Sequence, residues 1–345
     1  MTRKFVIICP GSFITGGPEA LHQLCHHLGQ VPGVEAAMHY IGGFDRRVAD
    51  EYWSRYKVAT APSALVDGAS VVIPCNVDPR AYRVTAGGRK WMWWLGGKRT
   101  LPLDAFNDCH HAFQSEYARR RLERLGYRGL MLTDYLRDTF DRGTPVDAKE
   151  DLIAYNGTKS ALHMTRIRLS WPRLACVPVR GMSHDQVRAV LTRAKLYVDF
   201  GPHPGRDRMP REAALLGCVV LTNREGAAGV HEDVPLPEDL KVDTADIRLA
   251  VRRVQDALGD YERLHAALEP YRQWIRAQRD TFAAEARALA LADPPPPEPW
   301  DAERMARLVA GLDAESIDTG KSLDRRTEDA MAFAIEVEQA RFGPR

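Results

Sequence analysis

Short apolar runs alternate with helix-patterned segments over the first two thirds of the chain. The first run, Lys4–Cys9, is apolar from Phe5 onward and bounded by polar residues and a proline, which is typical of a buried strand. Strands that alternate with helices form parallel sheets, because each return crossing needs a long connection. The expected strands are Lys4–Cys9, Glu35–Ile41, Ser70–Ile73, Lys90–Leu95, His111–Gln114, Gly129–Leu132, Leu152–Tyr155, Leu174–Val179, Leu196–Phe200 and Val219–Thr222.

Helical periodicity fills several of the gaps between these strands. The expected helices are Pro18–Leu28, Val48–Val58, Glu116–Leu125, Ser183–Ala194 and one that begins at Pro210. Ser183 and Gln186 have the spacing of a capping box, and proline suits the first position of a helix. From Thr244 the pattern is helical almost to Ala292. The chain is therefore predicted to be an α/β protein.

A polar segment over residues 137–150 separates two such α/β halves. It carries Gly143 and Pro145 and lacks apolar periodicity, as an interdomain linker does. We predict an N-terminal Rossmann-like domain over residues 1–140 and a C-terminal one over 141–292, facing each other across a cleft. A proline-rich spacer and a helical tail fill residues 293–345, with helical patterns at 300–312 and 326–342.

The composition argues against several classes of function. The 345 residues include 48 Lys and Arg against 46 Asp and Glu, a net charge of +2 that argues against a dedicated nucleic-acid-binding protein. No apolar stretch approaches the ~20 residues of a membrane span, so no transmembrane segment is expected. The six cysteines are scattered, which argues against a zinc site and favours reduced thiols in a cytoplasmic protein.

Ligands of open α/β sheets bind beyond the carboxyl ends of the strands, so the loops there carry the candidate chemistry. Gly16 and Gly17 follow the first strand and precede a helix that begins near Pro18. Glycines allow close approach of the backbone, and the free N–H groups of a helix start favour a phosphate. The spacing fits neither a dinucleotide fingerprint nor a P-loop, and a turn that merely starts a helix is the alternative.

Two loops of the second half carry cationic side chains. Lys159, after the strand that ends at Tyr155, is a candidate phosphate contact, with a solvated surface lysine as the alternative. After the strand that ends at Phe200, Arg206, Arg208 and Arg211 surround Glu212. Guanidinium groups pair well with a diphosphate, and a carboxylate can accept the hydroxyl hydrogens of a ribose. A capping glutamate with surface arginines is the alternative. His203 is a further candidate phosphate contact.

These segments resemble the GT-B glycosyltransferases, the class built from two Rossmann domains. The resemblance is carried by GGPEAL (16–21), YNGTKS (155–160) and YVDFGPHPGRDRMPREAALLGC (197–218). It is closest to a bacterial group with YNPKKG- and DFGxHPGKDRxPREAA-type blocks. That group also has WWLS-, QSEYA- and LTDY-type segments, which correspond here to residues 93–96, 114–118 and 132–135. The resemblance covers most of residues 1–290.

The resemblance implies a nucleotide-sugar donor held mainly by the second half and an acceptor held by the first. The glycine loop falls on Gly16 and Gly17, the diphosphate lysine on Lys159 and the ribose glutamate on Glu212. Neither a metal nor a cofactor is expected, because cationic side chains and helix starts neutralise the leaving diphosphate. The full set of implied donor-binding residues is Gly16, Gly17, Asn156, Lys159, His203, Arg208, Arg211 and Glu212.

The sequence departs from the family pattern at several positions. Many retaining members carry a second glutamate eight positions before the one that matches Glu212, and Pro204 stands there, so retention and inversion both stay open. Gly157, Thr158 and Ser160 replace Pro, Lys and Gly of the related block. Residues 96–98 also replace a more polar segment.

Glycosyl transfer needs its departing diphosphate stabilised, and Lys159, Arg208 and Arg211 are the candidates. An inverting reaction also needs a base, for which Asp78 and Asp134 are weak candidates. Trp91, Trp93 and Trp94 suit a buried strand better than a sugar platform.

Three functions are compatible with the sequence. The first is a metal-independent glycosyltransferase that uses a nucleotide-diphosphate sugar; the others are a non-catalytic nucleotide-sugar-binding relative and a GT-B-type sugar-nucleotide epimerase. The acceptor is open: a saccharide, a lipid carrier, a small molecule or a nucleobase. The tail is a candidate oligomerisation segment.

Overall fold

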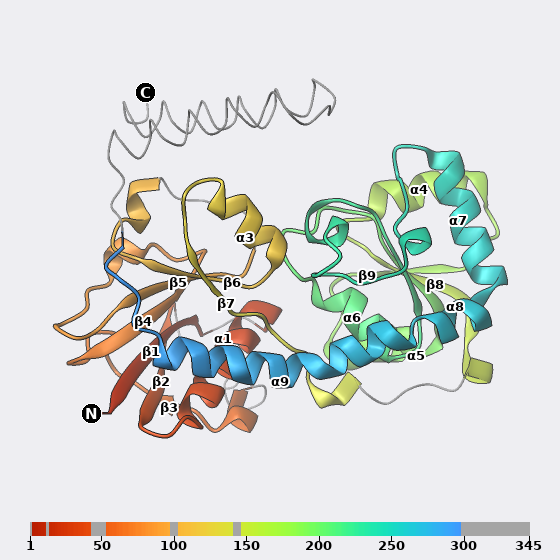
Figure 1. Cartoon of the computed structure of the whole chain (residues 1–345). Helices are drawn as coiled ribbons and strands as arrows, with labels where there is room; N and C mark the ends of the chain where they lie inside the picture. Colours follow the sequence, from red (N-terminus) through yellow and green to blue (C-terminus); the bar gives the residue numbers. More distant parts are fainter. Residues whose placement is uncertain (1, 12–13, 43–52, 97–102, 141–145, 298–345) are drawn as a thin grey trace, which may run out of the picture. The chain divides into compact units, whose positions relative to one another are not determined.

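The computed structural model describes residues 2–11, 14–42, 53–96, 103–140 and 146–297 (Figure 1). The described chain forms two compact units. Of the described residues, unit 1 takes those within 1–113, 119–131 and 286–297, and unit 2 those within 114–118 and 132–285. Residues 132–140 thus pack in unit 2; the domain limits at 140 and 292 stay predictions. The linker residues 141–145 and the two tail helices at 300–312 and 326–342 lie outside the described residues.

Unit 1 contains a seven-stranded sheet in the order β3-β2-β1-β4-β5-β6-β7, with every neighbouring pair parallel. The strand order reverses direction between β1 and β4, which makes their carboxyl ends the topological switch point. Its strands are β1 (Arg3–Pro10), β2 (Val34–Ile41), β3 (Ala59–Thr60), β4 (Ala69–Pro74), β5 (Lys90–Trp94), β6 (His110–Phe113) and β7 (Gly129–Met131).

Helix α1 (Gly16–Gly29) connects β1 to β2 and packs against both. Helix α3 (Glu116–Glu123) follows β6, and 3-10 turns cover Ser54–Tyr56, Pro79–Ala81 and Leu103–Phe106. The predicted helix Val48–Val58 is not continued to its expected end. Residues 48–52 lie outside the described residues, and the turn at 54–56 stops at Lys57, whose φ of 49° is left-handed and incompatible with an α-helix.

The tryptophans of β5 belong to the core of unit 1. Trp93 and Trp94 are 0% exposed and Trp91 is 2% exposed. The indole Nε1 of Trp94 donates a hydrogen bond to Nδ1 of His111 at 3.0 Å. The one polar atom of this buried side chain therefore has a hydrogen-bond partner. The core interpretation is confirmed, and a sugar platform is excluded because the rings are inaccessible.

Unit 2 contains a four-stranded parallel sheet in the order β11-β10-β8-β9. Its strands are β8 (Glu150–Asn156), β9 (Cys176–Val179), β10 (Ala194–Asp199) and β11 (Val219–Thr222). The chain crosses from β8 to β9 on one side and then to β10 on the other side of β8. The carboxyl ends of β8 and β10 therefore flank the switch point of this sheet.

The helices of unit 2 follow the local signals with two exceptions. Helix α5 (His184–Arg193) begins with the predicted capping box of Ser183 and Gln186. Helix α4 (Ala161–Ser170) was not expected, and α6 (Arg208–Leu215) begins earlier than expected. The helical region from Thr244 divides into α7 (Ile247–Gly259), α8 (Tyr261–Ala267) and α9 (Glu269–Leu291).

The end of α9 belongs to unit 1. There the guanidinium of Arg3, the first residue of β1, donates to the carbonyl oxygens of Ala290 and Ala292, each at 2.9 Å.

All six cysteines are free thiols. Among the described helices, none combines the length and the apolar content that crossing a bilayer requires.

Candidate functional site

Two loops leave the switch point of unit 2 side by side. Asn156 ends β8 and Asp199 ends β10, and the amide Nδ2 of Asn156 donates to Oδ2 of Asp199 at 3.2 Å. The loop after β8 carries Lys159, and the loop after β10 carries His203. The structure thus brings three of the predicted donor-binding residues to one edge of one sheet.

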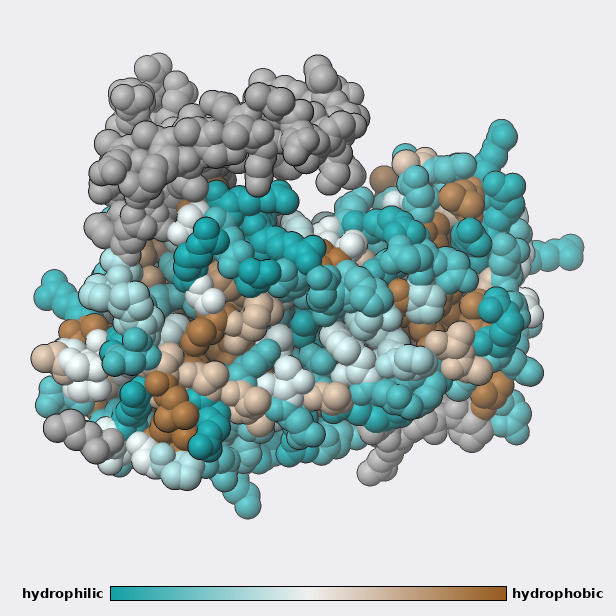
Figure 2. Space-filling model, viewed as in Figure 1, coloured by the Kyte–Doolittle hydropathy of each residue, from teal (hydrophilic) through white to brown (hydrophobic). Residues whose placement is uncertain are grey.

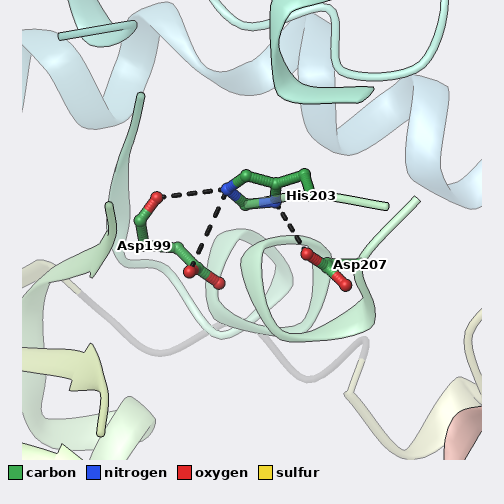
Figure 3. A group of neighbouring side chains, drawn as sticks. All are labelled: Asp199, His203 and Asp207. Carbon is green, nitrogen blue, oxygen red and sulfur yellow. Dashed lines mark hydrogen bonds and ion pairs between the residues drawn. The ribbon is translucent and has the colours of Figure 1, made fainter. Parts of the chain in front are cut away.

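His203 lies between two carboxylates (Figure 3). Its Nδ1 is 2.7 Å from Oδ2 of Asp207, and its Nε2 is 3.2 Å from the main-chain oxygen and 4.0 Å from Oδ1 of Asp199. The imidazole is 2% exposed. Lys159 completes the group, because its Nζ lies 2.5 Å from the same Oδ2 of Asp207.

The charges of this group determine its protonation. Burial opposes the charged form of His203, but the hydrogen bond to Asp207 and the charge of Asp199 outweigh it and raise the histidine pKa. Burial also works against ionised Asp207, yet the bond and charge of His203 and the charge of Lys159 lower the pKa of Asp207. Burial raises the pKa of Asp199. The raised pKa of His203 and the lowered pKa of Asp207 both favour an ion pair between these two side chains, and Lys159 contacts the same carboxylate.

Asp199, His203 and Asp207 could in principle hold a metal ion, since one ligand atom from each lies within 4.8 Å of the others. The surroundings do not fit a divalent cation well. The ammonium of Lys159 already lies against Asp207, and both ring nitrogens of His203 already face oxygen atoms. The geometry favours an internal ion-pair network, and the absence of a metal stays a prediction.

The position of Lys159 is fixed by its own loop. Oδ1 of Asn156 accepts hydrogen bonds from the backbone N–H groups of Thr158 and Lys159, at 3.1 and 3.0 Å. On the other side, a Cβ added to Gly201 would lie 2.4 Å from Cβ of Lys159. Only glycine allows this approach of the two loops.

Helix α6 begins at Arg208, two residues before the predicted start at Pro210. Asp207 is its N-cap, although that carboxylate bonds His203 and Lys159 instead of the helix N–H groups. Pro210 is the third helical residue, where the missing N–H costs nothing because it has no intrahelical partner. Glu212 consequently stands in the second turn, whereas a helix beginning at Pro210 would have placed it in the first turn.

Arg208 and Glu212 remain near each other on α6. Nε of Arg208 lies 3.9 Å from Oε1 of Glu212, and one terminal nitrogen donates to the carbonyl of Tyr135 at 3.2 Å. The side chains of Arg208 and Glu212 are 12% and 9% exposed. Lys159, at 25%, is more exposed than either of them, so it is the cation most open to a ligand on these two loops.

Arg211 is buried in an ion pair. Its terminal nitrogen lies 2.9 and 3.0 Å from the two carboxylate oxygens of Asp134 and 2.9 Å from the carbonyl of Arg206. Gln114 donates to the same carboxylate at 2.9 Å. Arg211 is 2% exposed and Asp134 is 4% exposed. This arrangement argues against a direct contact of Arg211 with a diphosphate and against Asp134 as a base.

The third arginine of this loop, Arg206, is also a structural residue. Its Nε lies 3.0 Å from Oδ1 of Asp233, and another nitrogen donates to Gln278 at 2.8 Å. Asp233 in turn accepts the backbone N–H groups of Glu116 and Tyr117, both at 2.7 Å. The expectation that all three arginines crowd around Glu212 as diphosphate contacts is therefore replaced by one partly exposed candidate, Arg208.

The remaining candidates lie in unit 1. Gly16 is the first residue of α1, and a Cβ on Gly17 would meet Leu95 at an ordinary 3.7 Å. Asp78 caps a 3-10 turn and forms an ion pair with Arg80 at 2.7 Å; this hydrogen-bonded cation lowers the pKa of Asp78. A lowered pKa makes a carboxylate a weaker base.

Sequence reasoning missed Asp199 and Asp207. Their signal is the spacing Asp-x3-His-x3-Asp across the end of a strand, which places two carboxylates around one histidine. Residues 97 and 98, where the sequence departs from the family pattern, lie outside the described residues.

No protein-family model matches the sequence, and a comparison with curated protein sequences finds no match. Solved structures do match. The E. coli trehalose-6-phosphate structure bound with UDP-2-fluoro glucose has 10% identity and a TM-score of 0.55, covering 85% of this chain and 100% of that one. An alpha-glucosyltransferase in complex with UDP and a 13-mer DNA has 9% identity and a TM-score of 0.53, covering 82% and 100%.

A third match is AviGT4, a glycosyltransferase involved in avilamycin A biosynthesis, with 14% identity, a TM-score of 0.50 and coverage of 84% and 99%. At these identities the likeness concerns the fold. Two parallel α/β units, matched over most of the chain by glycosyltransferases, identify the architecture. The described chain has the GT-B fold of the glycosyltransferases that it matches.

Proposed function

We propose that this protein is a glycosyltransferase that takes a sugar from a nucleoside-diphosphate sugar without a metal ion. The observation that carries the proposal is the placement of Lys159 on the loop from β8 and of Arg208 at the start of α6, directly after the loop from β10; these two strands flank the switch point of unit 2. Open α/β sheets bind their ligands at such points, and the fold is one that transfers sugars in the structures it matches.

Lys159 can move from Asp207 to a diphosphate without leaving that carboxylate unpaired. Asp207 has two cationic partners, so it keeps the imidazolium of His203 when the lysine turns to a ligand. A buried carboxylate left without any partner would otherwise oppose that movement. His203 is thus proposed as a positioning residue, and Lys159 and Arg208 as the groups that stabilise the departing diphosphate.

The other residues take supporting roles in this proposal. Glu212 accepts ribose hydroxyl hydrogens, and the ion pair of Arg211 with Asp134 holds the start of α6, which carries Arg208. Gly16 and Gly17 remain predicted phosphate contacts. We do not propose Asp78 or Asp134 as the base, since each is bonded to an arginine. The six free thiols support a reducing compartment such as the cytoplasm.

The test is binding of nucleoside diphosphates in EDTA, measured by calorimetry and thermal melting. The probes are UDP, GDP, ADP, CDP and dTDP, and the variants are Lys159→Met and Glu212→Gln. The matched control is Arg193→Gln, an exposed member of an ion pair with Glu150 in the same unit. One diphosphate should bind the wild type, and Lys159→Met should weaken it about tenfold or more, the worth of a charged hydrogen bond.

Two results would overturn the proposal. Either no diphosphate binds in EDTA, or Lys159→Met binds as tightly as the control. Consumption of the matching sugar nucleotide in the presence of an acceptor panel supports transfer. Tight binding without consumption refutes it in favour of a non-catalytic binding protein.

A further inference from the structure

Helix α4 of unit 2 carries apolar side chains on two opposite sides. Met164 and Ile167 are 0% exposed and face the core. Leu162 and Leu169 are 61% and 78% exposed. These two leucines are seven residues apart, close to two helical turns, so they form one stripe on the side away from the core. Packing of the helix against the core does not explain why these two leucines are exposed on one side.

Arg166, on the same side of α4 as the two leucines, is one of several exposed arginines on α4 and the neighbouring helix α7. Helix α7 packs beside α4, and both helices bury one side in the same core. Together they expose Arg166, Arg168, Arg248, Arg252 and Arg253. Helix α4 has no acidic residue and α7 has one, Asp256; Asp246, the N-cap of α7, uses its carboxylate on two backbone N–H groups.

These five arginines have no carboxylate partner among the described residues. Several exposed arginines elsewhere in unit 2 are paired, such as Arg193 with Glu150 at 2.7 Å and Arg263 with Asp260 at 2.5 Å. Exposed Arg173 and Arg180, like these five, have no ion pair among the described residues. Figure 2 shows hydrophobic residues scattered among hydrophilic ones over α4 and α7. We call Leu162, Arg166, Leu169, Arg248 and Arg252 the α4–α7 surface. It combines an excess of positive charge with exposed leucine.

We propose that the α4–α7 surface docks the protein on an anionic lipid bilayer. Arginines near an anionic surface gain electrostatic attraction, and leucines gain by entering the boundary between headgroups and acyl chains. A nucleic acid would attract the arginines but offers exposed leucines little, because its affinity comes mainly from phosphates. The leucine stripe therefore decides between these two anionic partners. The residues involved are separate from the proposed donor site, so this proposal stands or falls without it.

The experiment is vesicle flotation of the full chain, with phosphatidylcholine alone or with about 30% phosphatidylglycerol. The test variants are Leu162→Ser with Leu169→Ser, and Arg166→Gln with Arg252→Gln. The matched controls are Leu65→Ser with Leu291→Ser, which are 54% and 52% exposed, and Arg55→Gln with Arg121→Gln, which are exposed arginines of unit 1. Folding of every variant is checked by its melting temperature.

We expect binding to the anionic vesicles, weakened as salt rises from about 50 to 300 mM. The arginine pair should lose about 25-fold in affinity, since each arginine near the surface contributes about fivefold. The leucine pair should lose binding to a similar extent, and both control pairs should bind like the wild type. The proposal is overturned if the wild type ignores anionic vesicles or binds neutral ones equally. It is also overturned if the leucine pair binds normally while duplex DNA competes.

Discussion

Replacing Asp134 with asparagine is expected to destabilise unit 2 strongly. The change keeps the size of the side chain and removes its charge. Arg211 would then be a cation at 2% exposure whose carboxylate partner is gone, although an amide oxygen still accepts one hydrogen bond. Gln114 would keep an acceptor only if the new amide turned its oxygen toward it.

The magnitude follows from the burial of the pair. Breaking a buried ion pair by removing one partner costs about 3–5 kcal/mol, because the remaining charge stays desolvated. For a unit of this size each kcal/mol lowers the melting temperature by about 2–4 °C, so the expected drop is about 6–20 °C. The ion pair of Asp151 and Lys195 gives the contrast, since its carboxylate is 72% exposed. Asp151→Asn should cost less than about 1 kcal/mol.

The assay is thermal and urea unfolding of wild type, Asp134→Asn, Asp151→Asn and the double variant Asp134→Leu/Arg211→Met. The double variant removes both charges and should be more stable than Asp134→Asn. The reasoning is refuted if Asp134→Asn melts within about 2 °C of wild type. If it also abolished sugar transfer without that drop, Asp134 would be the base after all.

Three further outcomes are expected for variants at or next to the predicted donor-binding residues. The raised pKa of His203 means that its imidazolium stabilises the fold fully below pH ~6.5 and loses this effect as pH rises through the folded-state pKa. His203→Gln should therefore flatten the fall in melting temperature between pH 6 and 8.5. An unchanged slope would contradict this. Gly201→Ala should cost about 1–3 kcal/mol in urea unfolding and displace Lys159, because the new Cβ would lie 2.4 Å from Cβ of Lys159. Gly259→Ala, with nothing within 4 Å, is its control, and equal effects would argue against the close approach. Gly17→Ala should leave stability unchanged or raise it by up to about 1 kcal/mol; unaltered diphosphate binding in calorimetry would then refute the predicted phosphate approach.

The fold was largely readable from the sequence because its strands are short apolar runs bounded by polar residues. Each of the ten expected strands is present, with ends that differ by up to two residues. β3 was missed because its two residues are both exposed and leave no apolar signal. Helix α4 was missed because Leu162 and Leu169 lie opposite Met164 and Ile167, which hides the one-sided periodicity that marks a helix.

The sequence predicted the position of site residues that follow strands, but not of residues whose partner is distant in the chain. Lys159 and His203 follow strands, so their place at a sheet edge could be predicted. The burial of Arg211 could not, because its partner Asp134 lies 77 residues earlier in the chain. A guanidinium beside a glutamate looks the same in a sequence whether it faces a ligand or a distant carboxylate.

The discontinuous make-up of unit 1 has a consequence for biosynthesis. Arg3 begins β1, an interior strand of that sheet, yet its guanidinium bonds to carbonyls of Ala290 and Ala292 at the end of α9. A ribosome adds about 5–20 residues per second, so β7 emerges roughly 8–30 s before these carbonyls exist. During that interval the first sheet is complete while its last helical turns are missing. Unit 2 is therefore synthesised while unit 1 is still incomplete, and a chain that stops at residue 285 lacks the last segment of unit 1.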